Sequence, residues 1–172
     1  MAASSLIAHF QMLGRYNTII NQRLYGACAQ LPDEEYRKER SGSFRSIHRT
    51  LNHVLLGDRI WMSRFTGHGF TMTPGLDTVL YDDFPSLRAA RESEDLRIEA
   101  FLADLTEAFL GKDFRYVNNA GNLCVDAAPL VLAHFFNHQT HHRGQVHVML
   151  SQTGIKPPSL DMHRAIRPDA SL

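Results

Sequence analysis

The sequence contains little cysteine and no long run of apolar residues. Its two cysteines, Cys28 and Cys124, lie far apart and show no CxxC spacing, so we expect neither a disulfide framework nor a thiolate zinc site, and this usage is typical of a reducing cytosol. No window approaches the ~18 consecutive apolar residues of a membrane span. Residues 1–13 lack the basic region and long apolar run of a signal peptide. We therefore expect a cytoplasmic protein with no membrane partner.

The sequence also lacks net charge. Lys+Arg and Asp+Glu each total 18, so no overall field attracts nucleic acid or an acidic membrane. Four arginines do gather in one region, with acidic residues beside the first of them, and we interpret this region as a solvated loop and helix edge. These arginines are Arg37, Arg40, Arg45 and Arg49. We expect no nucleic-acid partner.

Length and composition indicate one ordinary globular domain. The chain has 172 residues, of which 44% are hydrophobic and 21% charged, as in typical soluble domains. A domain of this size buries roughly 70% of the surface that its unfolded chain exposes, so it needs no metal or disulfide merely to fold. We expect a single domain over residues 1–172, in which residues 159–172 form a polar C-terminal tail.

Four long segments show apolar residues at spacings of three and four, which is typical of amphipathic helices. The expected helices cover about residues 4–30, 43–65, 85–110 and 127–152. Pro32 ends the first helix, Ser43 is a candidate N-cap of the second, and Gly154 follows the fourth. The pattern predicts an all-α fold, a four-helix bundle.

The connections between these helices differ in character. Residues 34–42 are polar. Residues 67–84 form a loop that is long for a compact domain, which makes it a candidate lid or mouth of a site. Residues 114–122 read as a short extended excursion or hairpin before the last helix.

Histidine is abundant, and half of it is concentrated in one segment. The chain has 10 histidines, and five of them fall in the last expected helix: His134, His138, His141, His142 and His147. Side chains four residues apart on a helix are neighbours, ~5–6 Å apart at Cβ, and two imidazoles so placed can share one cation. His138 and His142 have this spacing, and so do His134 and His138. One helical face combines imidazoles with an amide and a thioether: His134, His138, His142, Gln145 and Met149.

These histidines favour a metal site over a purely structural role. The alternative is a set of core or surface histidines satisfied by hydrogen bonds, but a buried face with several imidazoles is hard to explain by packing alone. The pattern is not that of the zinc proteases, because Gln139 stands where their general-base glutamate follows the first histidine. A third ligand must come from elsewhere. His48 and His53 are five residues apart, so only one can face the metal, and helical projection favours His48.

Two strings of residues resemble the DinB family of damage-inducible metalloenzymes, which are unrelated to the DNA polymerase of the same name. They are Thr50–Trp61 (Thr-Leu-Asn-His-Val-Leu-Leu-Gly-Asp-Arg-Ile-Trp) and Asn137–Gln145 (Asn-His-Gln-Thr-His-His-Arg-Gly-Gln). Supporting marks are Tyr16, Asn17, Asn21, Arg23, Leu24, Ser43, Phe44, Ser46, Ile47, His48, Pro157, Pro158 and Asp161. The similarity extends over about residues 10–161.

The resemblance implies a four-helix bundle with up-down-down-up connections, often dimeric, that holds a divalent ion, zinc or nickel, in a three-histidine site. By motif position the ligands are His53, His138 and His142, with His53 in place of the projected His48. A homodimer is therefore the expected assembly.

The resemblance also implies a choice of functions. One is a metal-dependent enzyme, with a thiol-dependent S-transferase using a low-molecular-weight thiol as one hypothesis and a metal-dependent hydrolase as another. The other is a non-catalytic metal-binding or stress-response dimer, in which a fourth side chain closes the site; the candidates for it are His48, His68 and His134. No catalytic residue is assigned. Asp58 is interpreted as a partner that caps or orients a histidine, and Arg143 as a surface pair.

Overall fold

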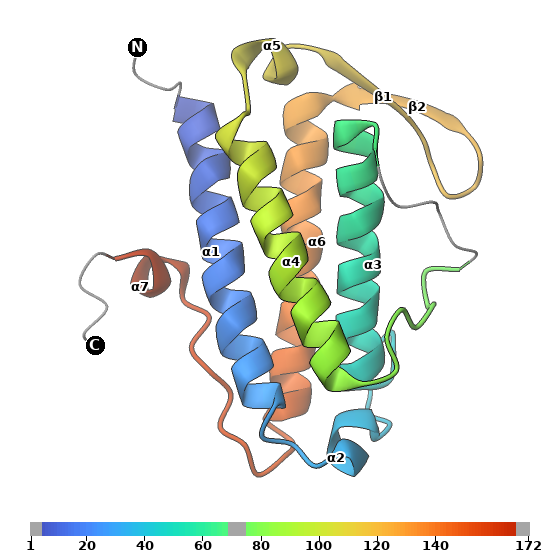
Figure 1. Cartoon of the computed structure of the whole chain (residues 1–172), viewed down its shortest axis with the longest axis vertical. Helices are drawn as coiled ribbons and strands as arrows, with labels where there is room; N and C mark the ends of the chain where they lie inside the picture. Colours follow the sequence, from blue (N-terminus) through green and yellow to red (C-terminus); the bar gives the residue numbers. More distant parts are fainter. Residues whose placement is uncertain (1–4, 69–74, 168–172) are drawn as a thin grey trace.

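The structure, a computed structural model, describes residues 5–68 and 75–167. The chain is mostly helical and carries one small two-stranded sheet (Figure 1). Its elements, in chain order, are α1 (Ser5–Cys28), α2 (Asp33–Arg37), α3 (Ile47–Thr66), α4 (Phe84–Ala103), α5 (Glu107–Leu110), β1 (Asp113–Val117), β2 (Leu123–Ala127), α6 (Ala128–Leu150) and α7 (Met162–Ile166). None of the helices in these described ranges combines the length and apolar character needed to cross a membrane.

Four long helices, α1, α3, α4 and α6, lie side by side (Figure 1). Helix α1 contacts α4 and α6, and α3 contacts the same two helices. Helices α1 and α6 run from the end of the molecule that carries α5 toward the end that carries α2, and α3 and α4 run in the opposite direction (Figure 1). As a result α3 and α6, which carry the two motif strings, are antiparallel neighbours.

The two larger apolar clusters lie one toward each end of the long helices, and a third, small cluster lies between α1 and α7. The cluster at the α5 end is rich in aromatic rings and includes Phe10, Phe65, Leu102, Phe114 and Phe135. The cluster at the α2 end includes Leu24, Tyr36, Leu51, Leu87 and Leu150. All four long helices contribute to each cluster, so burial of apolar area along their shared faces drives their association.

Between these clusters, the middle turns of the four helices bury polar side chains, several of which are charged. Arg91 on α4 pairs with Asp58 on α3 and, at 2.9 Å, with Asp95 one turn along its own helix. Gln139 on α6 donates a 2.8 Å hydrogen bond to the other oxygen of Asp58. All four side chains are almost completely buried, so each charge depends on these partners for the hydration that it has lost.

Arg143 on α6 belongs to the same polar layer. Its guanidinium donates to Asn17 on α1 and lies over the Tyr16 ring, 5.4 Å from the ring centroid. Only 3% of Arg143 is exposed, so its interpretation as a surface pair is wrong. Its charge is held inside by amide oxygens and an aromatic face.

Two expected helix limits were wrong, and in each case a side chain caps the start of a helix at a place that the apolar pattern did not indicate. The second long helix begins at Ile47, and Ser46, not Ser43, is its N-cap: Ser46 Oγ accepts from the Arg49 N–H at 3.2 Å. The preceding turn contains Arg45 at φ +62°, a left-handed conformation that few non-glycine residues adopt. The third long helix ends at Ala103, and a new short helix, α5, starts after its own N-cap, Thr106.

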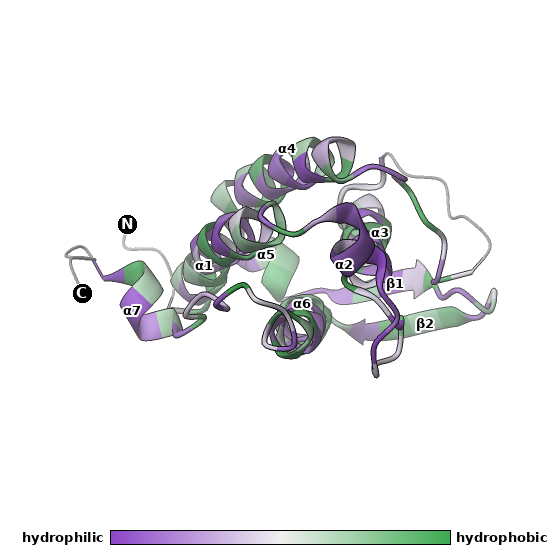
Figure 2. Cartoon of the chain, turned by 90° about the horizontal axis from the view of Figure 1, so that it is seen from below, coloured by the Kyte–Doolittle hydropathy of each residue, from purple (hydrophilic) through white to green (hydrophobic). Residues whose placement is uncertain are grey.

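Two short helices occupy segments in which no element was expected. Helix α2 lies in the polar connection after α1, where it buries Tyr36. Helix α7 lies in the segment expected to be a polar tail; it packs on the outside of α1 (Figure 2), buries Ala165, and is preceded by a 2.7 Å hydrogen bond from the Tyr16 hydroxyl to the Leu160 carbonyl. The rest of the expected tail, residues 168–172, lies outside the described residues.

The expected hairpin before the last helix is confirmed. Strands β1 and β2 pair antiparallel, with Asp113 opposite Ala127 and Val117 opposite Leu123. Phe114 anchors the hairpin in the apolar cluster at the α5 end.

Candidate metal centre

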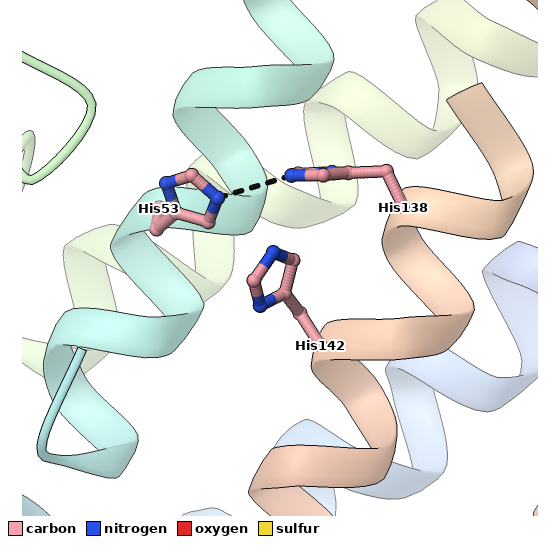
Figure 3. A group of neighbouring side chains, drawn as sticks. All are labelled: His53, His138 and His142. Carbon is pink, nitrogen blue, oxygen red and sulfur yellow. Dashed lines mark hydrogen bonds between the residues drawn. The ribbon is translucent and has the colours of Figure 1, made fainter. Parts of the chain in front are cut away.

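Three histidines from two helices converge on one point. His53 projects from α3, and His138 and His142 project from adjacent turns of α6 (Figure 3). Ligand nitrogens of the three rings all lie within 4.8 Å of one another. The dashed line in Figure 3 joins the Nε2 atoms of His53 and His138, which are 3.0 Å apart. In the described part of the chain, no cysteine, carboxylate or further histidine adds a ligand atom to these three histidines.

The separation of these nitrogens suits a shared divalent ion. Two nitrogens bound at ~2.1 Å to one ion lie about 3.0 Å apart at a right angle and about 3.4 Å apart at a tetrahedral angle. The 3.0 Å between the Nε2 atoms of His53 and His138 falls at the short end of this range. The donor set therefore fits zinc, nickel and related ions that favour imidazole.

Hydrogen bonds on the far side of two rings fix which nitrogen faces the group. The Nδ1–H of His53 donates to the Leu76 carbonyl at 2.7 Å. His142 Nδ1 lies 2.9 Å from the Gln145 side-chain oxygen, to which it donates, and the Gln145 amide nitrogen lies 3.1 Å from His141 Nε2. Because a carbonyl oxygen only accepts, both rings carry their proton on Nδ1 and keep a lone pair on Nε2, the usual arrangement around metal-binding histidines.

A glycine makes room for the third ring. A Cβ atom at Gly57 on α3 would lie 2.9 Å from Cε1 of His138, closer than any normal contact. Glycine inside a helix costs about 1 kcal/mol relative to alanine. Here that cost allows the imidazole of His138 to approach α3 and reach His53.

Burial keeps all three rings neutral near pH 7. It lowers the pKa of His53 and of His142 below the ordinary value for histidine. For His138, burial and the neighbouring rings of His142 and His53 lower the pKa to about 3. Since neutral imidazole is the form that binds metal, the site is ready for an ion without first losing protons.

Phe44 contacts two histidines of the group and also lines a neighbouring cavity. Its ring stacks on His53, with centroids 3.8 Å apart, and presents an edge to His142 at 5.5 Å. It also lines a cavity of about 600 Å³ beside the start of α3. The charged residues around this cavity include both signs: Arg37, Glu39, Arg45, Arg49, Asp77 and Asp82.

The structure does not bring His48 into the group, although helical projection favoured it. His48 is buried, and its Nδ1 lies 3.3 Å from the Tyr36 hydroxyl. Projection failed because 14 of the 20 residues of α3 are buried, so the helix has no single inward face. The long loop after α3 contributes the Leu76 carbonyl, while residues 69–74 of that loop lie outside the described residues.

Other sequence candidates lie outside the group, although the His134 ring is a neighbour of His138, 6.3 Å between centroids. Asp58 contacts Arg91 and Gln139 and orients no histidine, contrary to its interpretation. His134 is exposed and packs edge-on against Trp61 at 5.4 Å. His147 Nε2 lies 3.1 Å from the Pro158 carbonyl oxygen.

Sequence reasoning missed the Leu76 carbonyl, the stacking of Phe44 and the space at Gly57. The first is a backbone group, which no residue type signals. Phe44 and Gly57 do stand inside the motif strings or their supporting marks, but only the structure shows that both contact a histidine of the group.

Comparison with known proteins decides the family. A sequence model of the DinB family matches residues 4–170. The chain belongs to the DinB family. It is 30% identical over 151 residues to Protein DinB of Bacillus subtilis (strain 168), a match that covers 83% of this chain and 84% of the relative.

A solved structure shows the same fold. The crystal structure of a DinB-like protein from Bacillus cereus ATCC 10987 superposes with a TM-score of 0.62 over 83% of this chain and 91% of that chain, at 20% sequence identity. The resemblance to the DinB family seen in the sequence is thereby confirmed, and so is a mostly helical DinB-like fold.

Proposed function

We propose that this DinB-family protein binds one divalent metal ion, zinc or nickel, through His53, His138 and His142, and that it is an enzyme. The observation that carries the proposal is the convergence of three neutral imidazoles, two of which are held by hydrogen bonds with Nε2 facing the others. This arrangement requires that α3, α6 and the loop with the Leu76 carbonyl hold fixed positions relative to one another. Core histidines that only form hydrogen bonds do not require such convergence.

The proposed reaction is S-transfer from a low-molecular-weight thiol. An ion with three histidine ligands keeps a coordination position open and lowers the pKa of a water or thiol bound there. In the transfer, the thiol proton leaves to solvent, the sulfur bonds to an electrophilic carbon of the second substrate, and the leaving group departs with its electron pair. The cavity beside Phe44, with charges of both signs in its lining, would hold a thiol that carries both ammonium and carboxylate groups.

Two alternatives have less support. A non-catalytic metal site would be closed by a fourth side chain, yet over residues 5–68 and 75–167 no fourth ligand joins the group, and His48 and His134 are engaged with Tyr36 and Trp61. A hydrolase would benefit from a carboxylate base at the metal, and the buried Asp58 is committed to Arg91 and Gln139.

We further propose that the four long helices act as an up-down-down-up bundle and that the protein is a homodimer. The outer face of α6 supports an interface, because Leu130 and Val148 are 60% and 57% exposed there and large apolar side chains gain by mutual burial. Light scattering of the purified protein should give twice the monomer mass of 19.5 kDa; a monomer at micromolar concentration contradicts this assembly.

Metal analysis of tag-free protein tests the function. We expect about one zinc or nickel ion per chain, lost in His53→Ala, His138→Ala and His142→Ala. His134→Ala is the matched control, since this exposed histidine lies on the same helix outside the group. Metal-loaded protein should then conjugate a low-molecular-weight thiol to an electrophile. The decrease in free thiol measures this reaction. Metal binding without any conjugation would favour the non-catalytic alternative.

A further inference from the structure

The side chain of Asn52 on α3 holds residues 80–81, which lie in the loop between α3 and α4. Its oxygen accepts hydrogen bonds from two consecutive backbone N–H groups, those of Leu80 at 2.8 Å and Tyr81 at 2.9 Å. Its amide nitrogen donates to the Tyr81 carbonyl at 3.2 Å and to the His48 carbonyl at 3.0 Å. Asn52 is fully buried, and every polar atom of its side chain is used.

The same loop supplies the hydrogen bond that orients His53. The Leu76 carbonyl, four residues before Leu80, accepts from Nδ1 of His53 at 2.7 Å. Asn52 and His53 are adjacent on α3, so one turn of the helix both fastens the loop and receives its carbonyl. The acceptor for Nδ1 of His53 is this loop carbonyl and not a charged side chain.

We propose that Asn52 is a positioning residue of the metal centre. By fixing residues 80–81 it holds the Leu76 carbonyl against His53, which keeps the proton of that ring on Nδ1 and its Nε2 lone pair directed at His138 and His142. The proposal rests on the metal-binding function proposed above. It adds that the geometry of the site depends on a buried amide that touches no ligand nitrogen.

A simple packing role does not account for these contacts. Burying an amide costs free energy unless its hydrogen bonds are replaced, and an apolar side chain of similar size would pack in the same space without that cost. The pair of bonds to consecutive N–H groups instead specifies one position of the loop backbone. Loss of the group that hydrogen-bonds a histidine ligand typically weakens metal binding 10–100-fold, and here that group is the Leu76 carbonyl, in the loop that Asn52 holds.

The first test uses metal-free protein and the ¹⁵N chemical shifts of His53. In the wild type we expect the Nδ1–H tautomer, with protected amides at Leu80 and Tyr81. In Asn52→Ala we expect a mixture with the Nε2–H tautomer. A wild-type His53 protonated on Nε2 overturns the proposal, whether or not any variant folds.

The second test compares zinc affinities by competition with a chelator. We expect a loss of roughly tenfold or more in Asn52→Ala. Thr50→Ala is the matched control for stability, because Thr50 is equally buried on α3 and its hydroxyl bonds only the Ser46 carbonyl. Leu76→Ala, which keeps the carbonyl, should leave affinity unchanged.

The outcomes separate this inference from the proposed function. If the wild type binds no zinc, the proposed function fails, and the tautomer of His53 still reports on Asn52. If the wild type binds zinc and Asn52→Ala binds it equally well with an unchanged tautomer, the positioning role alone is contradicted. Equal losses of affinity in Asn52→Ala and Thr50→Ala would likewise assign Asn52 a structural role only.

Discussion

The Nε2 atoms of His53 and His138 lie 3.0 Å apart, although the two residues are separated by 85 positions in the sequence. His53 keeps its proton on Nδ1, bound to the Leu76 carbonyl, so its Nε2 lone pair points at a second ring nitrogen. At this distance the two nitrogens need one proton or one cation between them. A hydrogen at that place belongs to a neutral His138 ring, so uptake of a further proton would charge the buried pair and is strongly disfavoured.

Acid should consequently destabilise the metal-free fold through His138. Its pKa in the folded chain is about 3, below the ordinary 6.5 of the unfolded chain, so the unfolded chain takes up the proton first as the pH falls. The contribution of neutral His138 to the free energy of unfolding is complete above pH 6.5 and is lost as the pH falls toward 3. Over this range the free energy of unfolding decreases by up to ~1.4 kcal/mol per pH unit. Urea unfolding between pH 7.5 and 4.5 measures it.

His138→Asn provides the control for this slope. Burial raises the pKa of Asp95 to about 6, which favours the folded state on acidification and has the opposite sign. The difference between wild type and His138→Asn isolates the histidine, and identical pH dependence in both would contradict the account.

Gly57→Ala should abolish metal binding with little loss of helix. The added Cβ would lie 2.9 Å from Cε1 of His138, so this ring must leave its position, whereas alanine is itself the better helix former. Gly144→Ala on α6 is the control, since nothing lies within 4 Å of its Cβ position. Isothermal titration with zinc should show binding in Gly144→Ala and none in Gly57→Ala; normal binding in both would exclude the close approach of His138 to α3.

Gln145→Leu should weaken zinc binding 10–100-fold, because His142 loses the acceptor that holds its proton on Nδ1. His141→Ala removes the other partner of Gln145 and an edge-on ring contact with His142, 4.8 Å between centroids, but leaves the Nδ1 acceptor of His142 in place, so its effect should be much smaller. Chelator competition measures both affinities. Equal effects of the two substitutions would mean that Gln145 does not orient His142.

Arg91→Ala should be among the most destabilising substitutions in the chain. It leaves Asp58 and Asp95 buried without their cation, and breaking a buried pair in this way typically costs about 3–5 kcal/mol. Arg88→Ala, on the same helix, breaks an exposed pair with Glu92 and should cost less than about 1 kcal/mol. Chemical denaturation compares them, and similar losses would show that the buried layer contributes little.

Much of the fold could be predicted from the sequence because periodic apolar residues specify helices directly. The spacing of His138 and His142 likewise places two imidazoles on one face without any tertiary knowledge. The limits of helices were harder, since Ser46 and Thr106 act as caps only in their actual backbone conformations. Helical periodicity alone does not reveal that helix α4 ends at Ala103 and that a new helix, α5, begins at Glu107.

The rest of the site depends on tertiary contacts. Choosing between His48 and His53 requires knowledge of what covers each side of α3, and only the family resemblance pointed to His53. Arg143 was expected at the surface because arginine usually lies there, yet α1 supplies Asn17 and Tyr16 to receive it.

Anomalous diffraction from crystals of the metal-loaded protein, recorded at the zinc or nickel absorption edge, tests the central claim most directly. The account predicts one peak per chain, about 2.1 Å from Nε2 of His53, His138 and His142. It is contradicted if the protein takes up metal and the peak lies elsewhere, or if this position remains empty at saturating zinc and nickel.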